Sequence, residues 1–388
     1  LKQGKSFFHM GSSGHEAAQL AAAYAMYSGK DWVFPYYRDA ALCIALGMTS
    51  RDHLLSFLAR ADDPSSGGRQ MPHHYGYKNL RIVSQSSSTG TQFLQALGCA
   101  LACKKEKAKE IVYVSAGEGT TSQGDYHEAL NWASLAKAPV VFHIQDNEYA
   151  ISTHKSEQSS NSVYAMASGY KNLARFEVDG TDFFETNLAF KQAVERGRRG
   201  KGPSLVVSNV VRLMSHSSSD DQRKYRSITS LNKDKNRDPI SILKNQCLKE
   251  NFISLNELNE IETNVDKQVN LDSDWAEAKD HPEANTALDY IYDNKIYNYE
   301  TNFNSISDKI VMVDAINHAL NEEMQRNNKM VIYGQDVSDP KGGVFTATKG
   351  LSDEFGKDRV FNSPLAESSI IGTAIGMAVA GYKPVVEI

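Results

Sequence analysis

A strand that ends at a Gly-Glu-Gly turn, followed by a helix and a second strand, constrains the fold of this chain most. Residues 111–115 are a short β-branched and aromatic run just before the turn at 117–119, and such a run predicts a buried strand. Residues 125–137 carry small and apolar residues at helical spacing, and residues 140–144 form a second apolar run. The pattern predicts a strand–helix–strand unit of an α/β domain with parallel strands.

The loops after these two strands carry residues suited to a metal-bound diphosphate. Glu118 follows the first strand and Asn147 the second, and ligands bind at the carboxyl ends of parallel strands. Mg²⁺ prefers oxygen ligands and often shares them with phosphates. Glu118 offers a carboxylate, Asn147 a side-chain carbonyl and Tyr149 a backbone carbonyl, while Gly117 and Gly119 let the backbone approach a ligand closely. The alternative is a plain strand-to-helix turn with an exposed glutamate, because a short glycine motif is a weak signal by itself.

Several segments around these loops resemble one family. They are residues 33–39 (Val-Phe-Pro-Tyr-Tyr-Arg-Asp), 68–76 (Gly-Arg-Gln-Met-Pro-His-His-Tyr-Gly), 149–153 and 212–221. Over about residues 1–300 the chain resembles the alpha subunit of branched-chain 2-oxoacid dehydrogenase, the thiamine-diphosphate-dependent decarboxylating component of that complex. From about Ile306 onward it resembles the start of the beta subunit, through the segments 342–345, 358–362 and 364–368.

The resemblance implies a thiamine-diphosphate-binding α/β fold, with a mainly parallel sheet flanked by helices and the beginning of a second, similar α/β module. We expect an alpha-type diphosphate- and Mg²⁺-binding domain over residues 1–230, a helical arm and linker over 231–305, and an incomplete beta-type pyrimidine-binding module over 306–388. In the arm, Ser254 and Glu257 form a capping box ahead of apolar residues at helical spacing. The strand expected at the end, 384–388, has no continuation, so we expect the chain to stop inside a domain.

The resemblance also assigns roles in cofactor binding. Tyr37 and Arg38 fall at positions that contact the diphosphate, although a surface ion pair between Arg38 and Asp39 is the alternative. Ser87 and Thr89 fall on a loop that borders the cofactor and a monovalent cation, K⁺. Thr89 stands where the family has a wedging leucine, so a merely polar loop is equally compatible with these residues. Since one charge pair at 4 Å contributes only about 4 kcal/mol at an effective dielectric of about 20, we expect a divalent cation beside the arginine.

Two residues are expected to act in catalysis. His216 matches the family's active-site histidine, adjacent to the thiazolium, where an imidazole can stabilise or protonate the intermediate; a hydrogen-bonded loop histidine is the alternative. Glu367 matches the glutamate that hydrogen-bonds the aminopyrimidine ring and promotes its imino tautomer; the alternative is a glutamate that the dipole favours at a helix start. The chain departs from the family's pattern at two positions near the expected metal ligands. Gln145 stands where some relatives have arginine, and Asp146 stands where asparagine is usual.

Composition excludes several classes of protein. Of the 388 residues, 41% are hydrophobic and 23% charged, as in soluble proteins of two or three domains. The net charge of −5 argues against a nucleic-acid binder, and no apolar run approaches the length of a membrane span. The four cysteines form no disulfide framework and no paired metal motif, which fits a reducing compartment. We expect a cytoplasmic protein in a bacterium, or a mitochondrial matrix protein in a eukaryote.

The resemblance implies 3-methyl-2-oxobutanoate dehydrogenase activity. The expected reaction is oxidative decarboxylation of a branched-chain 2-oxoacid, with acyl transfer to a lipoyl domain of the acyltransferase core. Thiamine diphosphate, Mg²⁺ and K⁺ are the expected cofactors, and self-association, as a dimer, is expected. Two alternatives stay open: a pyruvate- or acetoin-type dehydrogenase component, and a non-catalytic scaffold remnant that keeps the fold.

Overall fold

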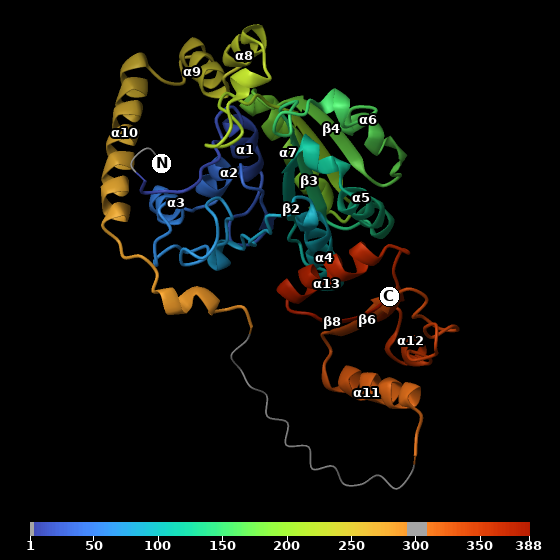
Figure 1. Cartoon of the computed structure of the whole chain (residues 1–388). Helices are drawn as coiled ribbons and strands as arrows, with labels where there is room; N and C mark the ends of the chain where they lie inside the picture. The colour runs from blue at the N-terminus through green and yellow to red at the C-terminus, as the bar shows by residue number, and fades with distance from the viewer. Residues whose placement is uncertain (1–3, 293–308) are drawn as a thin grey trace. The chain divides into compact units, whose positions relative to one another are not determined.

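The computed structural model describes residues 4–292 and 309–388. The chain divides into two compact units, Leu1–Pro282 and Glu283–Ile388 (Figure 1). This boundary differs from the expected divisions at 230 and 305, because the helices between residues 228 and 277 belong to the first unit. Residues 293–305 of the expected linker, and 306–308 of the expected second module, lie outside the described residues. The three-part division therefore stays a prediction.

The first unit is built on a parallel five-stranded sheet with the strand order β1-β2-β3-β5-β4. The strands are β1 (Trp32–Phe34), β2 (Val112–Gly117), β3 (Val140–Asp146), β4 (Ala174–Asp179) and β5 (Ser204–Asn209). The two strands expected at 111–115 and 140–144 are confirmed as β2 and β3, whereas β1 was not expected from the sequence. Gly117 lies opposite Gln145 in the β2–β3 register. The loops that carry Glu118 and Asn147 therefore leave the sheet side by side.

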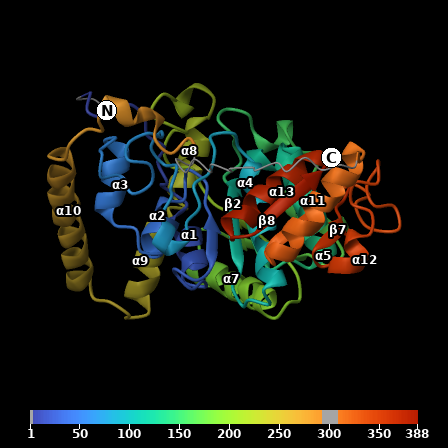
Figure 2. The ribbon, with the colours of Figure 1, turned by 90° about the horizontal axis from the view of Figure 1, so that it is seen from below.

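Helices cover both faces of this sheet (Figures 1 and 2). Side chains alternate along the strands, so that Tyr113 and His143 contact Phe190 on one face, whereas Phe142 contacts Phe93 on the other. This alternation is the two-residue period of a strand buried on both faces. The first face carries α1 (Glu16–Ala23) and α7 (Phe183–Arg198), and the second carries α4 (Thr91–Lys105) and α5 (Gly124–Ala136). The remaining helices before residue 170 are α2 (Ala40–Ala45), α3 (Ser50–Phe57) and α6 (Val163–Met166).

Three helices follow the last strand of the first unit: α8 (Ile228–Lys235), α9 (Pro239–Lys249) and α10 (Leu255–Glu277). The expected capping box of Ser254 and Glu257 is confirmed at the start of α10. The far end of α10 packs on α3, where Ala276 contacts Leu55 and Leu58. Helical spacing of apolar residues usually marks a buried face, but four such residues of α10 are 45–60% exposed: Leu255, Ile261, Val265 and Val269.

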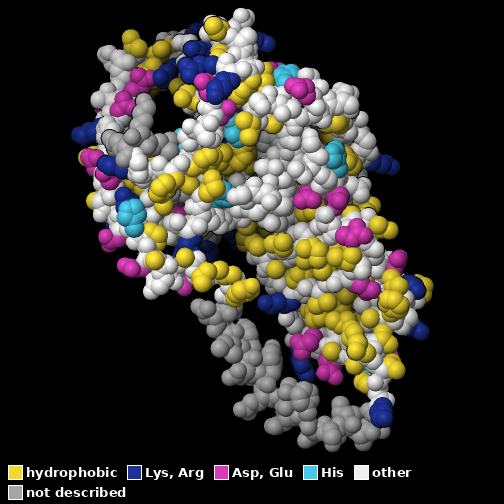
Figure 3. Space-filling model, in the orientation of Figure 1, with side chains coloured by type: hydrophobic (Ala, Val, Ile, Leu, Met, Phe, Trp, Pro, Cys, Tyr) yellow, Lys and Arg dark blue, Asp and Glu magenta, His cyan; other side chains and the backbone are white. Residues whose placement is uncertain are grey.

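The second unit contains a parallel three-stranded sheet with the order β7-β6-β8. Its elements are α11 (Met312–Arg326), β6 (Met330–Gly334), α12 (Leu351–Phe355), β7 (Val360–Asn362), α13 (Glu367–Val379) and β8 (Lys383–Glu387). Hydrophobic side chains gather on a face of this unit (Figure 3), and α13 leaves Ile371 and Ile375 exposed. The expected α/β fold, with parallel sheets and flanking helices, is confirmed. In the described parts of the chain, no helix combines the length and apolar character that crossing a membrane requires.

Candidate active site

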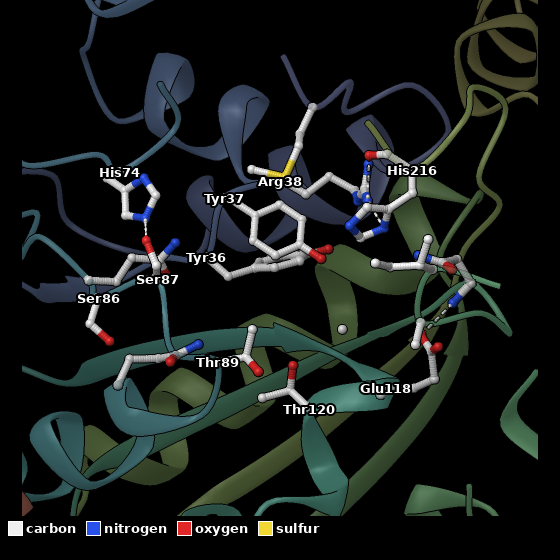
Figure 4. A pocket seen from close by; sticks show the side chains of 18 of the residues that line it. Tyr36, Tyr37, Arg38, His74, Ser86, Ser87, Thr89, Glu118, Thr120 and His216 are labelled. Carbon is white, nitrogen blue, oxygen red and sulfur yellow. Dashed lines mark hydrogen bonds between the residues drawn. The ribbon is translucent and has the colours of Figure 1, made fainter. Parts of the chain in front are cut away.

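A cavity of about 410 Å³ in the first unit collects residues that are far apart in the sequence (Figure 4). It opens where β1, β2 and β3 end, which is the edge of a parallel sheet where ligands bind. Ten of the eleven expected cofactor residues line it: Tyr37, Arg38, Ser87, Thr89, Gly117, Glu118, Gly119, Asn147, Tyr149 and His216. The eleventh, Glu367, belongs to the second unit. There it begins α13, is exposed and accepts a hydrogen bond of 3.3 Å from Gln335.

Glu118 is a buried carboxylate at the end of β2, with 4% of the residue exposed. Its Oε2 accepts a hydrogen bond of 3.2 Å from the backbone N–H of Asn147, and its Oε1 has no hydrogen-bond partner among the described residues. Burial, and then the nearby Asp146, raise the pKa of Glu118 to about 7. The alternative of an exposed glutamate is therefore wrong. A buried carboxylate with a free oxygen is costly unless something pairs with it, and a cation is the natural partner.

Asn147 lies in the turn after β3 and faces the same cavity. Its Nδ2 lies 3.1 Å from Nε2 of His15, and its Oδ1 accepts a hydrogen bond of 3.3 Å from the backbone N–H of Tyr149. Burial lowers the pKa of His15 well below its usual value, so the ring is neutral and its Nε2 accepts from the amide. This contact orients the side-chain carbonyl of Asn147, and the sequence contained no signal that His15 would make it.

Arg38 and His216 meet on the opposite side of the cavity (Figure 4). Arg38 is buried, donates to the carbonyl of Gly11, and places Nη2 3.4 Å from Nδ1 of His216. Its neighbour Asp39 is also buried, but it accepts hydrogen bonds from Ser115 and Gln145. The expected alternative of a surface ion pair between Arg38 and Asp39 is therefore wrong. Gln145, which donates its hydrogen bond to Asp39, does not line the cavity.

His216 is held by its backbone N–H, which donates to Asp220 over 2.9 Å. Partial burial and the charges of Arg38 and Arg212 lower the pKa of His216 to about 4. The imidazole is therefore neutral at pH 7. Since Arg38 can only donate hydrogen bonds, Nδ1 acts as the acceptor and Nε2 carries the proton. The ring can thus donate a hydrogen bond into the cavity.

A serine-rich loop, residues 84–89, forms another wall of the cavity. Nε2 of His74 lies 2.9 Å from Oγ of Ser87, and Nδ1 of His74 lies 3.0 Å from the carbonyl of Met71. The hydroxyl of Ser86 bonds Oγ1 of Thr91 over 3.0 Å. Sequence reasoning assigned no role to His74, although it stands in a segment that resembles the family. Its contacts fix the position of Ser87.

A metal ion in this cavity would need further ligands in addition to acidic, histidine and cysteine side chains. Within residues 4–292 and 309–388, no group of three or more His, Cys, Asp or Glu side chains could hold a metal ion. The expected ligands are one carboxylate, one amide and one backbone carbonyl, which fit Mg²⁺ only when a phosphate supplies further oxygens. Gly119, which follows Glu118, packs closely on Ala150, since a Cβ at position 119 would lie 3.1 Å from Cβ of Ala150.

Two family models match the chain in succession. The family described as "Dehydrogenase E1 component" matches residues 1–285, and "Transketolase, pyrimidine binding domain" matches residues 308–388. The chain belongs to the dehydrogenase E1 component family. The two matches follow one another along the chain, which is consistent with an E1-type part followed by a pyrimidine-binding part. The cavity lies entirely within the E1 match, whereas Glu367 lies within the pyrimidine-binding match.

Alpha subunits of 2-oxoisovalerate dehydrogenase are among the similar proteins. The subunit from Bacillus subtilis (strain 168) is 40% identical over 296 residues, which cover 75% of this chain and 88% of that protein. The mitochondrial subunit from Macaca fascicularis is 34% identical, covering 75% of this chain and 65% of that protein. The mitochondrial subunit from Homo sapiens is 36% identical over 257 residues, covering 65% of this chain and 56% of that protein. The chain thus spans less than two thirds of these two mitochondrial relatives.

Proposed function

We propose that this chain is the thiamine-diphosphate-dependent component of a 2-oxoacid dehydrogenase complex and acts on branched-chain 2-oxoacids. This is 3-methyl-2-oxobutanoate dehydrogenase activity, with acyl transfer to a lipoyl domain of the acyltransferase core. The family match and the names of the relatives support the reaction class. The observation that carries the proposal is the cavity that joins Glu118, Asn147, Arg38 and His216.

The residues of the cavity fit Mg²⁺ and a diphosphate. Glu118 has a buried oxygen without a partner in the described structure, and the Asn147 carbonyl is oriented by His15. These two groups and the backbone carbonyl of Tyr149 would hold the metal ion, while Arg38 and Tyr37 would contact the diphosphate. Thiamine diphosphate, when bound, supplies the electron sink that decarboxylation of a 2-oxoacid requires. The serine-rich loop around Ser87 and Thr89 is the proposed place for K⁺.

His216 is the proposed proton donor of the alpha-type part. Its neutral ring lines the cavity and carries a proton on Nε2, so it can donate to a substrate oxygen on which negative charge develops. Arg38 holds the opposite side of the ring and Asp220 holds the backbone. These two contacts orient the imidazole, which reduces the entropic cost of bringing the ring into the reactive geometry.

Glu367 is proposed to act at the pyrimidine end of the cofactor. It is the first residue of α13 and is exposed. Exposure is required if its carboxyl group is to contact a cofactor that other residues bind. Ile371 and Ile375 are exposed one turn apart on this helix, beside the half-buried Gly372, and a small residue allows close helix packing. We therefore propose that the protein self-associates as a dimer. Its proposed location is the bacterial cytoplasm, or the mitochondrial matrix in a eukaryote.

Apolar side chains support a branched aliphatic substrate. Phe8, Met10, Met71 and Ile151 line the cavity beside the polar groups, and each buried methyl group of a substrate contributes about 0.8 kcal/mol. The test is a panel of 3-methyl-2-oxobutanoate, pyruvate and acetoin with an artificial electron acceptor, with and without thiamine diphosphate and Mg²⁺. We expect the branched acid to react fastest, and only with the cofactors. Faster reaction of pyruvate or acetoin would favour the corresponding alternative, and failure to bind the cofactor would favour a scaffold.

A further inference from the structure

The turn that carries the proposed metal ligands is closed by a lysine. Nζ of Lys155 lies 3.1 Å from Oδ2 of Asp146 and 3.4 Å from Oε1 of Glu148. Its backbone N–H donates to the carbonyl of Glu148 over 2.9 Å. Oδ1 of Asp146 accepts from the backbone N–H of Glu148, also over 2.9 Å. Lys155 and Asp146 thus hold Glu148 from both sides.

Glu148 needs such support because its backbone is left-handed, with φ of 72°. Residues with a Cβ seldom adopt this conformation. Glu148 separates the two proposed metal ligands, Asn147 and Tyr149, so its conformation decides where their oxygens lie. The contacts of Lys155 therefore stabilise the part of the turn on which metal binding depends.

The positive charge of Lys155 also compensates the negative charge of Asp146. Asp146, Glu118 and Lys155 line a separate cavity of about 230 Å³. Of the residues that line it, Lys155 alone is a lysine or arginine. Asp146 is buried, with 7% of its side chain exposed, so water compensates its charge poorly. A neutral asparagine at position 146 would need no cation, whereas the buried aspartate of this chain does.

We propose that Lys155 is a positioning residue of the cofactor site: its ammonium group neutralises Asp146, while its backbone N–H and Asp146 hold Glu148 so that Asn147 and Tyr149 present their oxygens to Mg²⁺. Without it, the buried negative charge of Asp146 is uncompensated, directly before the proposed metal ligand Asn147 in the chain. The inference rests on the proposed function, because it requires Mg²⁺ and thiamine diphosphate in the larger cavity. Lys155 does not line the larger cavity, so it is not expected to contact the cofactor or the substrate.

The test compares Lys155→Met, Asp146→Asn and the double variant of the full chain by calorimetric titration of thiamine diphosphate at saturating Mg²⁺. We expect Lys155→Met to weaken binding about tenfold, since the loss of a group that orients a metal ligand typically costs 10–100-fold. Asp146→Asn should restore binding in the double variant to within about twofold of wild type, because a neutral amide needs no cation. Lys155→Arg, which keeps the charge, should bind more tightly than Lys155→Met.

Lys244→Met is the matched control. The side chain of Lys244 is 36% exposed, compared with 38% for Lys155, and it pairs with Glu262, while neither of these two residues lines the cavities. This variant should bind thiamine diphosphate as wild type does. Thermal unfolding of the cofactor-free variants shows whether each one folds. If Lys155→Met fails to fold, the double variant carries the test: binding near wild type supports the inference, and weak binding overturns it.

Equal binding by Lys155→Met and wild type would overturn the inference and leave the proposed function standing. Weak binding by Lys155→Met that Asp146→Asn does not restore would also overturn it, because the lysine would then act by some means other than compensating Asp146. Failure of the wild-type protein to bind thiamine diphosphate would refute the proposed function itself, and this inference with it. The wild-type titration therefore separates the two failures.

Discussion

Replacing Glu118 with glutamine should stabilise the cofactor-free protein while it removes tight cofactor binding. The pKa of Glu118 rises from 4.5 to about 7 because the carboxyl group is buried. In the unfolded chain the group loses its proton near pH 4.5, so above pH 7 the folded state holds a charge that it disfavours. At about 1.4 kcal/mol per pKa unit, this lowers the free energy of unfolding by about 3 kcal/mol. Glutamine can still accept the hydrogen bond from Asn147 and carries no charge.

Urea denaturation in the presence of EDTA measures this effect. The three tryptophans of the chain, Trp32, Trp132 and Trp275, all lie in the first unit, so their fluorescence reports on the unit that holds Glu118. The gain in Glu118→Gln should be about 3 kcal/mol at pH 8, should shrink below pH 7 and should vanish near pH 4.5. Glu195→Gln, which removes an exposed carboxylate paired with Arg199, is the control and should change little.

The same variant should bind thiamine diphosphate far more weakly at a fixed Mg²⁺ concentration. A charge pair worth about 4 kcal/mol corresponds to a loss of about 1,000-fold in affinity. A variant that is less stable than wild type at pH 8 would refute the claim that the buried carboxylate is held at a cost. A variant that binds the cofactor normally would refute the role of Glu118 as a metal ligand.

Three further predictions concern other residues. Burial lowers the pKa of His143 to about 3, so protonation favours the unfolded state below pH 6.5. On acidification, the free energy of unfolding of wild type should fall by up to about 1.4 kcal/mol per pH unit more than that of His143→Gln, as measured by urea titrations. Equal slopes for the two proteins would contradict this. His216→Asn should retain cofactor affinity and lower turnover by about 10²–10⁴-fold; turnover near wild type would exclude a proton-donor role. Glu367→Gln should likewise lose rate more than affinity, and mixing it with Glu118→Gln should restore activity if sites form between two copies, provided that subunits exchange; proton exchange at the thiazolium carbon at the wild-type rate would refute its role.

The sequence predicted the elements that local pattern determines. The unit from β2 to β3 was predictable because apolar runs, helical spacing and glycines mark it within a short stretch. Strand β1 was missed because its three residues, Trp32–Phe34, are too few to show a period. The exposed apolar side of α10 could not be predicted, because periodicity reveals that a helix is amphipathic and does not reveal which surface covers it.

The site could be predicted as a set of residues, but not as a set of contacts. Ten residues expected from the motif and from the resemblance line one cavity, yet the partners of those residues come from distant parts of the chain. His15 meets Asn147, and Asp39 turns away from Arg38 toward Ser115. Neither contact has a local sequence signal, since each depends on which strands and helices become neighbours.

The central claim is that the larger cavity binds thiamine diphosphate through a divalent ion held by Glu118 and Asn147. A crystal structure of the full chain grown with thiamine diphosphate and Mn²⁺, in place of Mg²⁺, tests it most directly because the anomalous signal locates the metal. The account predicts a single strong peak at coordination distance from the Glu118 carboxylate, the Asn147 side-chain carbonyl and the Tyr149 backbone carbonyl, with the diphosphate beside Arg38. A metal peak elsewhere, or a cofactor that binds outside this cavity, would contradict it.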